Sequence, residues 1–91
     1  MVSRIRLHRA GRHEFVNSAE VALSVKLGAK TRLWNLVQVR EGAQIGARCV
    51  IGRGVYIGPG VNVGDRCKIQ NNALVYDPAV IGDGVFIGPG A

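Results

Sequence analysis

Apolar residues recur at every sixth position of the chain from residue 15 to residue 91. The first position of each hexad is large and apolar, and the fifth is small or β-branched. Because a fifth position and the next first position are two residues apart, their side chains lie on the same face of an extended strand. Each hexad therefore predicts one short strand with an inward face. The first positions are Phe15, Val21, Leu27, Leu33, Val39, Ile45, Ile51, Ile57, Val63, Ile69, Val75, Ile81 and Ile87.

Positions three and four of the hexad are predicted corners. Eleven of the thirteen corners contain Gly, Pro, Asn, Asp or Ser, the residues that tight turns favour. Glycine also fills position two in seven hexads, and the period differs from that of a helix, so helices are excluded. Antiparallel hairpins would not require a strict spacing of six. The pattern predicts an all-β chain that winds into a parallel β-helix.

This pattern resembles the hexapeptide-repeat, or left-handed β-helix, superfamily. The resemblance implies three hexads per triangular coil, parallel pairing between coils and about four coils in this chain. It also implies left-handed winding, which the usual right-handed crossover preference would not predict. Residues eighteen apart would then share a column. Cys49 and Cys67 would share an inward column, and we expect buried free thiols there rather than a disulfide.

The front of the chain is strongly basic. The net charge is +6, and residues 1–14 contain four arginines and one glutamate. An arm that grips phosphates and a solvated leader without fixed structure both stay open, and the lack of aromatic interleaving favours the leader. We divide the chain into this leader, residues 1–14, and a β-helix domain, residues 15–91. With no membrane span and no signal peptide, we expect a cytoplasmic protein without nucleic-acid or membrane partners.

The outward columns distinguish three faces of the predicted coil. One face is mostly polar and has glycine throughout its second-position column. The second carries an apolar patch of Tyr56, Leu74 and Tyr76, which is typical of a contact surface. The third includes Trp34 and meets the second at the Asn71-Asn72 corner. We expect a homotrimer packed through these two faces, as the resemblance also implies.

Candidate catalytic groups are few. His8 and His13 are the only histidines and precede the repeat, so neither a Ser-His-Asp arrangement nor a zinc-histidine cluster fits the coil. We predict no metal site and assign no catalytic residue. The irregular stretch is 68–72, where Gln70 replaces the second-position glycine and two asparagines form the corner. From the residues alone this stretch is either a good left-handed corner or a cluster of donors for a sugar or phosphate.

Four stretches together resemble one subfamily: 28–34 (Gly-Ala-Lys-Thr-Arg-Leu-Trp), 39–43 (Val-Arg-Glu-Gly-Ala), 51–58 (Ile-Gly-Arg-Gly-Val-Tyr-Ile-Gly) and 68–72 (Lys-Ile-Gln-Asn-Asn). They are similar to the N-acetyltransferases that acetylate nucleotide-linked amino sugars for bacterial surface polysaccharides. The resemblance spans about residues 15–91. It implies acetyl-CoA as co-substrate, a nucleotide amino sugar as acceptor, and a set of binding residues. These are Lys68 for phosphate or sugar, Gln70, Asn71 and Asn72 for the sugar, Tyr76 and Trp34 as cleft walls, and Arg53 for the pyrophosphate.

The chain departs from the subfamily in two ways. Asn35 stands where members often have histidine, and members continue well past the position of Ala91. The chain stops in mid-pattern without an atypical capping repeat, so we expect a truncated form that lacks part of the active site. Two alternatives stay open: another hexapeptide acyltransferase, such as one acting on serine or tetrahydrodipicolinate, and a non-catalytic β-helix assembly module.

Overall fold

The computed structural model describes residues 14–15 and 19–91. In these residues the chain forms two-residue strands and no helix, which confirms the all-β prediction. From β2 onward, each strand consists of an outward sixth position followed by an inward first position. The strands are β1 (Glu14–Phe15), β2 (Glu20–Val21), β3 (Lys26–Leu27), β4 (Arg32–Leu33), β5 (Gln38–Val39), β6 (Gln44–Ile45), β7 (Val50–Ile51), β8 (Tyr56–Ile57), β9 (Asn62–Val63), β10 (Lys68–Ile69), β11 (Leu74–Val75), β12 (Val80–Ile81) and β13 (Phe86–Ile87).

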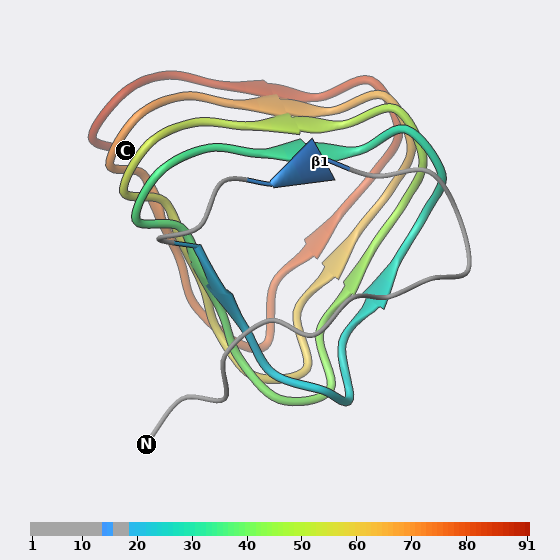
Figure 1. The fold of residues 1–91 in the computed structure, drawn as a ribbon. Coiled ribbons are helices and arrows are strands. Elements are labelled where there is room, and N and C mark those ends of the chain that lie inside the picture. Colours follow the sequence, from blue (N-terminus) through green and yellow to red (C-terminus); the bar gives the residue numbers. More distant parts are fainter. Residues whose placement is uncertain (1–13, 16–18) are drawn as a thin grey trace.

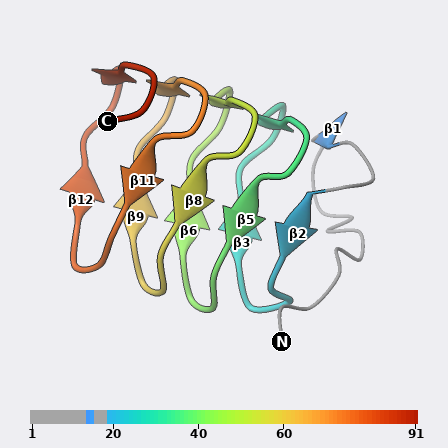
Figure 2. The ribbon, with the colours of Figure 1, turned by 90° about the vertical axis from the view of Figure 1, so that its left-hand side faces the viewer.

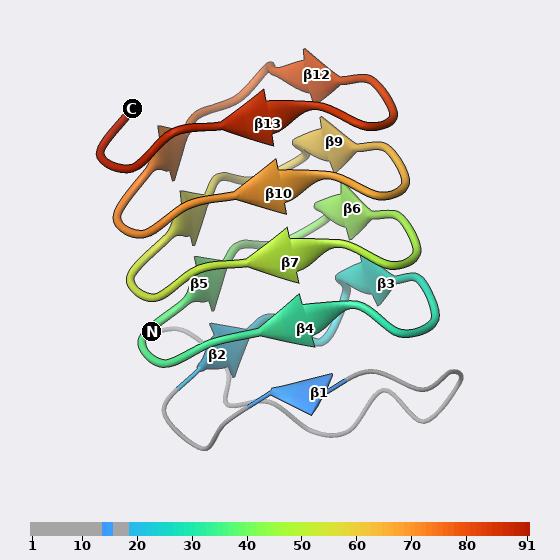
Figure 3. The same ribbon diagram turned by 90° about the horizontal axis from the view of Figure 1, so that it is seen from above.

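The strands form three parallel sheets, one on each side of a triangular coil (Figure 1). Sheet A has the order β1-β4-β7-β10-β13, sheet B the order β2-β5-β8-β11, and sheet C the order β3-β6-β9-β12. Each strand pairs with the strand eighteen residues further on, as Arg32 does with Val50 and Val50 with Lys68. Figure 2 shows sheet B from outside and Figure 3 shows sheet A, each stacked as successive coils. The chain turns anticlockwise as it recedes in Figure 1, so the coil is left-handed.

The first and fifth positions fill the interior, as the hexad pattern predicts. Leu33, Ile51 and Ile69 form one inward column of sheet A and are at most 2% exposed. Burial weakens in the last coil, where Ile87 is only partly buried and Val85 is 36% exposed. No described coil covers that end of the stack, so its apolar layer is half open.

Cys49 and Cys67 are buried free thiols, which confirms that prediction. The backbone N–H of Cys49 donates to Thr31 Oγ1 at 3.1 Å, and that of Cys67 donates to Cys49 Sγ at 3.4 Å. Each thiol in turn donates to a glycine carbonyl of the next coil, at 3.1 Å for Cys49 and 3.0 Å for Cys67. Burial raises the pKa of the Cys49 thiol. The polar atoms of this inward column are thus satisfied within the coil.

The corners turn through a left-handed residue at position four. Five glycines and five other residues have positive φ there among the twelve described corners. Asn72 is one of them, as expected of an Asn-Asn corner. The pattern did not predict the others, because residues with a Cβ ordinarily avoid this conformation by about 1–2 kcal/mol. These others are Lys30 (φ 63°), Leu36 (φ 61°), Arg48 (φ 57°) and Arg66 (φ 57°).

The predicted basic leader falls almost wholly on residues 1–13, which lie outside the described residues, and it stays a prediction. Within the part of the chain that the structure describes, no helix is long and apolar enough to cross a membrane.

Candidate functional site

A groove opens on sheet A where two bulky side chains flank a glycine. The second-position column there runs Trp34, Gly52, Gln70 and Gly88, one residue per coil. Because Gly52 has no side chain, a space of about 340 Å³ remains between the coils of Trp34 and Gln70. The space is open to solvent at the edge where sheet A turns into sheet B. Its lining comprises Trp34, Asn35, Val50, Gly52, Arg53, Ile69, Gln70 and Asn71.

Close stacking of the coils requires the glycine in this groove. A Cβ built on Gly52 would lie 2.8 Å from the backbone nitrogen of Asn71, well inside van der Waals contact. The gap beside Trp34 is therefore a consequence of how closely the coil of Gly52 and the coil of Asn71 approach each other.

Asn71 joins the groove to the corner that supports it. Its Oδ1 accepts a hydrogen bond from the backbone N–H of Arg53 at 3.0 Å. The N–H of Asn72 donates to the Arg53 carbonyl at 2.8 Å, and the N–H of Gly54 donates to the Asn35 carbonyl at 2.9 Å. This ladder holds Arg53 and Asn71 at fixed height on neighbouring coils. The asparagine is therefore both a corner residue and a groove residue.

The groove brings together four of the seven predicted binding residues: Trp34, Arg53, Gln70 and Asn71. The other three do not line it. Lys68 is an exposed outward residue of β10, and Asn72 forms the exposed left-handed corner. Tyr76 lies beyond β11 on the sheet B side. Sequence reasoning missed four lining residues, although their eighteen-residue columns would have placed them beside Trp34 and Arg53. They are Asn35, Val50, Gly52 and Ile69.

The lining groups of the groove can bind but are poor proton acceptors. Within the described residues, the Arg53 guanidinium, the Gln70 amide and the Asn71 amide nitrogen make no hydrogen bond or ion pair to protein. They are donors available to phosphate, carboxylate or hydroxyl oxygens, and the half-exposed Trp34 offers an apolar wall. No group of three His, Cys, Asp or Glu in the described part of the chain is placed to hold a metal ion.

Sheet B carries the predicted apolar patch beside a polar strip. Leu74 and Tyr76 are exposed, and the Tyr56 and Tyr76 rings lie 5.7 Å apart between centroids. Their role as a contact surface stays a prediction.

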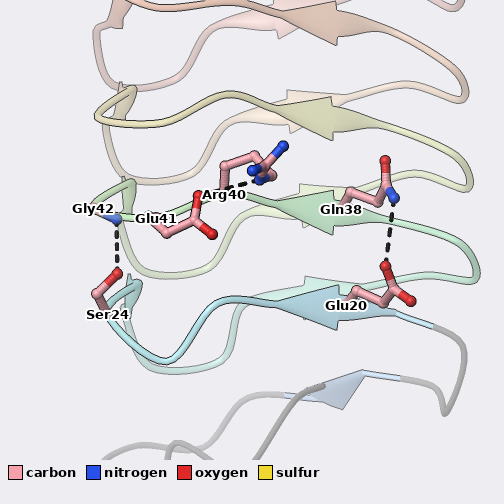
Figure 4. Close-up of polar contacts among 6 residues, drawn as sticks. All are labelled: Glu20, Ser24, Gln38, Arg40, Glu41 and Gly42. Atoms are coloured by element: carbon pink, nitrogen blue, oxygen red, sulfur yellow. Dashed lines mark hydrogen bonds and ion pairs between the residues drawn. The ribbon is translucent and has the colours of Figure 1, made fainter. Parts of the chain in front are cut away.

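The polar strip of sheet B lies in the lower coils. Gln38 donates to Glu20 at 3.4 Å, Arg40 pairs with Glu41 at 3.2 Å, and the N–H of Gly42 donates to the Ser24 hydroxyl at 2.9 Å (Figure 4). A hydrogen bond from its own backbone, aided by Arg40, lowers the pKa of the Glu41 carboxyl. This lower part of the face is therefore polar and internally paired.

The fold and the groove define a left-handed β-helix protein built from hexapeptide repeats. The family described as bacterial transferase hexapeptide (six repeats) matches residues 24–59 and 60–91, and the chain belongs to this family. No curated protein matches the chain.

Proposed function

We propose that the chain is an acetyl-CoA-dependent N-acetyltransferase, or part of one, whose acceptor is a nucleotide-linked amino sugar. Membership of a bacterial transferase family supports the reaction class. The observation that carries the acceptor is the groove, which unites an indole, a guanidinium and two amides on successive coils. A nucleotide sugar presents matching groups: a ring, a pyrophosphate and hydroxyls.

In this proposal the groove acts by positioning its ligand. The Gln70 and Asn71 amides hydrogen-bond the sugar, Arg53 contacts the pyrophosphate, and Trp34 covers one side of the ring. The free amine of the sugar attacks the thioester carbonyl, the thiolate of coenzyme A leaves as the amide forms, and the proton lost by the nitrogen passes to that thiolate or to water. Holding amine and thioester together supplies much of the rate, and amide or backbone donors steady the developing oxyanion. A strong protein base is not required, because a thiolate leaves readily.

Lys68, Asn72 and Tyr76 belong to the same proposal as residues outside the groove. Lys68 would meet the phosphates from the face of sheet A, with Asn72 and Tyr76 around the corner. A homotrimer packed through sheets A and B, and a cytoplasmic location, complete the proposal. The exposed Leu74 and Tyr76 support an interface on sheet B.

The test is to incubate the purified chain with acetyl-CoA and a panel of nucleotide-linked amino sugars, and to detect the acetylated product by mass spectrometry. Gln70→Ala should lower kcat/KM about two- to tenfold, the effect of losing one hydrogen bond. Gln44→Ala, the matched change on exposed sheet C, should leave it unaltered.

Binding is measured in parallel by calorimetry, so that a chain able to bind but not to turn over is recognised. Acetylation of serine or of a dicarboxylic amine alone would contradict the sugar acceptor and favour another hexapeptide acyltransferase. Absence of both turnover and nucleotide-sugar binding would contradict the proposal and favour a non-catalytic assembly module.

A further inference from the structure

A second polar surface lies along the edge where sheet C turns into sheet A, away from the groove. Three successive coils there read polar residue, glycine, cation, at spacings of two residues. All six side chains are exposed, and we term these nine residues the basic edge. They are Lys26, Gly28 and Lys30, then Gln44, Gly46 and Arg48, then Asn62, Gly64 and Arg66.

The cations of the basic edge occupy positions where glycine would fit better. Lys30, Arg48 and Arg66 all have positive φ, which is unfavourable for a residue with a Cβ. At the same hexad position the other two edges have the positive-φ residues Gly42, Gly54, Gly60 and Gly90, together with Leu36 and Asn72. Backbone strain of this kind clusters at functional sites, so a row of three cations in this conformation suggests a role for their side chains.

Backbone hydrogen bonds hold the cations in a row. The N–H of Arg48 donates to the Ala29 carbonyl at 2.9 Å, and the N–H of Arg66 donates to the Ala47 carbonyl at 2.8 Å. Successive cations along the edge are therefore one coil apart, a spacing of about 4.8 Å. The middle column of the basic edge is glycine, so no side chain stands between the column of polar residues and the column of cations.

The positive charge of this edge is only partly offset. Among the described residues, Lys30, Arg48 and Arg66 form no ion pair. Asp65 and Asp83 share the edge, where their Oδ1 atoms accept the backbone N–H of Ala47 at 2.9 Å and of Asp65 at 2.7 Å. The two carboxylates belong to the coils of Arg66 and Gly84. Asp65 thus reaches the coil of Arg48, whereas the coil of Lys26 and Lys30 holds two cations and no acid of its own at this edge.

We propose that the basic edge binds a linear acidic polysaccharide lying along the coil axis. The row of cations runs along the coil axis, so an extended chain that lies along the edge can bring its carboxylates to several cations at once. The Gln44 and Asn62 amides, in register on neighbouring strands, suit the hydroxyls of such a chain. The described outward residues of this edge include no aromatic ring on which a nucleobase could stack. This proposal does not rest on acetyl transfer, because it uses a different edge.

The test compares two double variants of equal net charge. Arg48→Gln/Arg66→Gln removes two cations of the basic edge, whereas Arg32→Gln/Arg40→Gln removes two cations outside the basic edge and the groove. Binding of polygalacturonate is followed by calorimetry at low and high salt, with neutral dextran, polyphosphate, single-stranded DNA and anionic vesicles as comparison ligands. Thermal unfolding by circular dichroism checks that each variant is folded.

We expect salt-sensitive binding of polygalacturonate that falls about fivefold or more in the first variant and less than twofold in the second, since each exposed charge contact is worth about two- to fivefold. Gln44→Ala/Asn62→Ala should weaken polygalacturonate and leave polyphosphate unchanged. Equal losses in both charge variants, or equal or tighter binding of DNA, polyphosphate or vesicles, would overturn the proposal. So would no binding of polygalacturonate.

Discussion

Substituting alanine at two glycines of one column tests how closely the coils stack. Gly64 and Gly82 lie in sheet C one coil apart, and neither has a positive φ. A Cβ on Gly64 would lie 2.8 Å from the backbone nitrogen of Asp83, whereas a Cβ on Gly82 would meet no atom within 4 Å. Since carbon contacts prefer about 3.5 Å or more, the coil above Gly64 would have to move by about 0.7 Å.

The two substitutions should have opposite effects on the free energy of unfolding. Overpacking at Gly64 costs about 1–3 kcal/mol and strains the 2.8 Å hydrogen bond from its N–H to the Ile81 carbonyl. At Gly82 the alanine loses no contact and restricts the unfolded chain, which stabilises by about 0.4–1 kcal/mol. The two variants should therefore differ by about 1.4–4 kcal/mol, a large share of the stability of a small domain.

Urea unfolding followed by far-ultraviolet circular dichroism measures this difference, with the fluorescence of the single tryptophan as a second probe. The midpoint should fall for Gly64→Ala and hold or rise for Gly82→Ala, with unchanged slopes. Equal destabilisation by both substitutions would refute the eighteen-residue register and, with it, the columns that build the groove.

Three further outcomes are expected. Lys30→Gly should raise the free energy of unfolding by up to about 1 kcal/mol, because glycine tolerates the positive φ, and the urea midpoint should rise with it. A lower midpoint would contradict this. Burial raises the pKa of the Cys49 thiol, so folding favours its protonated form. The contribution of this thiol to the free energy of unfolding should be fully present below pH 9.0 and should be lost as pH rises through the raised pKa. Cys49→Ala should lack this part of the loss. Asn71→Ala should cost about 0.5–1.5 kcal/mol, whereas Asn71→Asp, which keeps the acceptor for Arg53 N–H, should cost less.

The hexad period was sufficient to predict the strands and the interior. Ile45, Ile51 and Ile57 are buried because an inward residue every six positions leaves only one side of each strand free for solvent. The period does not contain the number of hexads per coil or the hand of the coil. Both came from the resemblance, and the number of hexads per coil is needed before Trp34 and Gln70 can be placed near each other.

The corners show where residue preferences were overridden. Leu36 and Arg48 would not be chosen for a left-handed turn on local preference. Seven of the described corners are nevertheless stacked on the corner one coil earlier by a backbone hydrogen bond, as Arg48 is on Ala29, and this ladder favours the same conformation in successive corners. For the same reason the bond between Asn71 and Arg53 was not foreseen, since it depends on the spacing of two coils.

The three-sided stack restricts how the length of this chain can change. Duplicating a full turn of eighteen residues adds one coil and leaves every later residue in the same sheet as before. Duplicating six residues between Trp34 and Gln70 would shift every later hexad to the next sheet. The hydrophobic interior would be kept, but Gln70 would lie in another sheet. Relatives that keep the groove should therefore change length only in whole turns, and only outside the segment between Trp34 and Gln70.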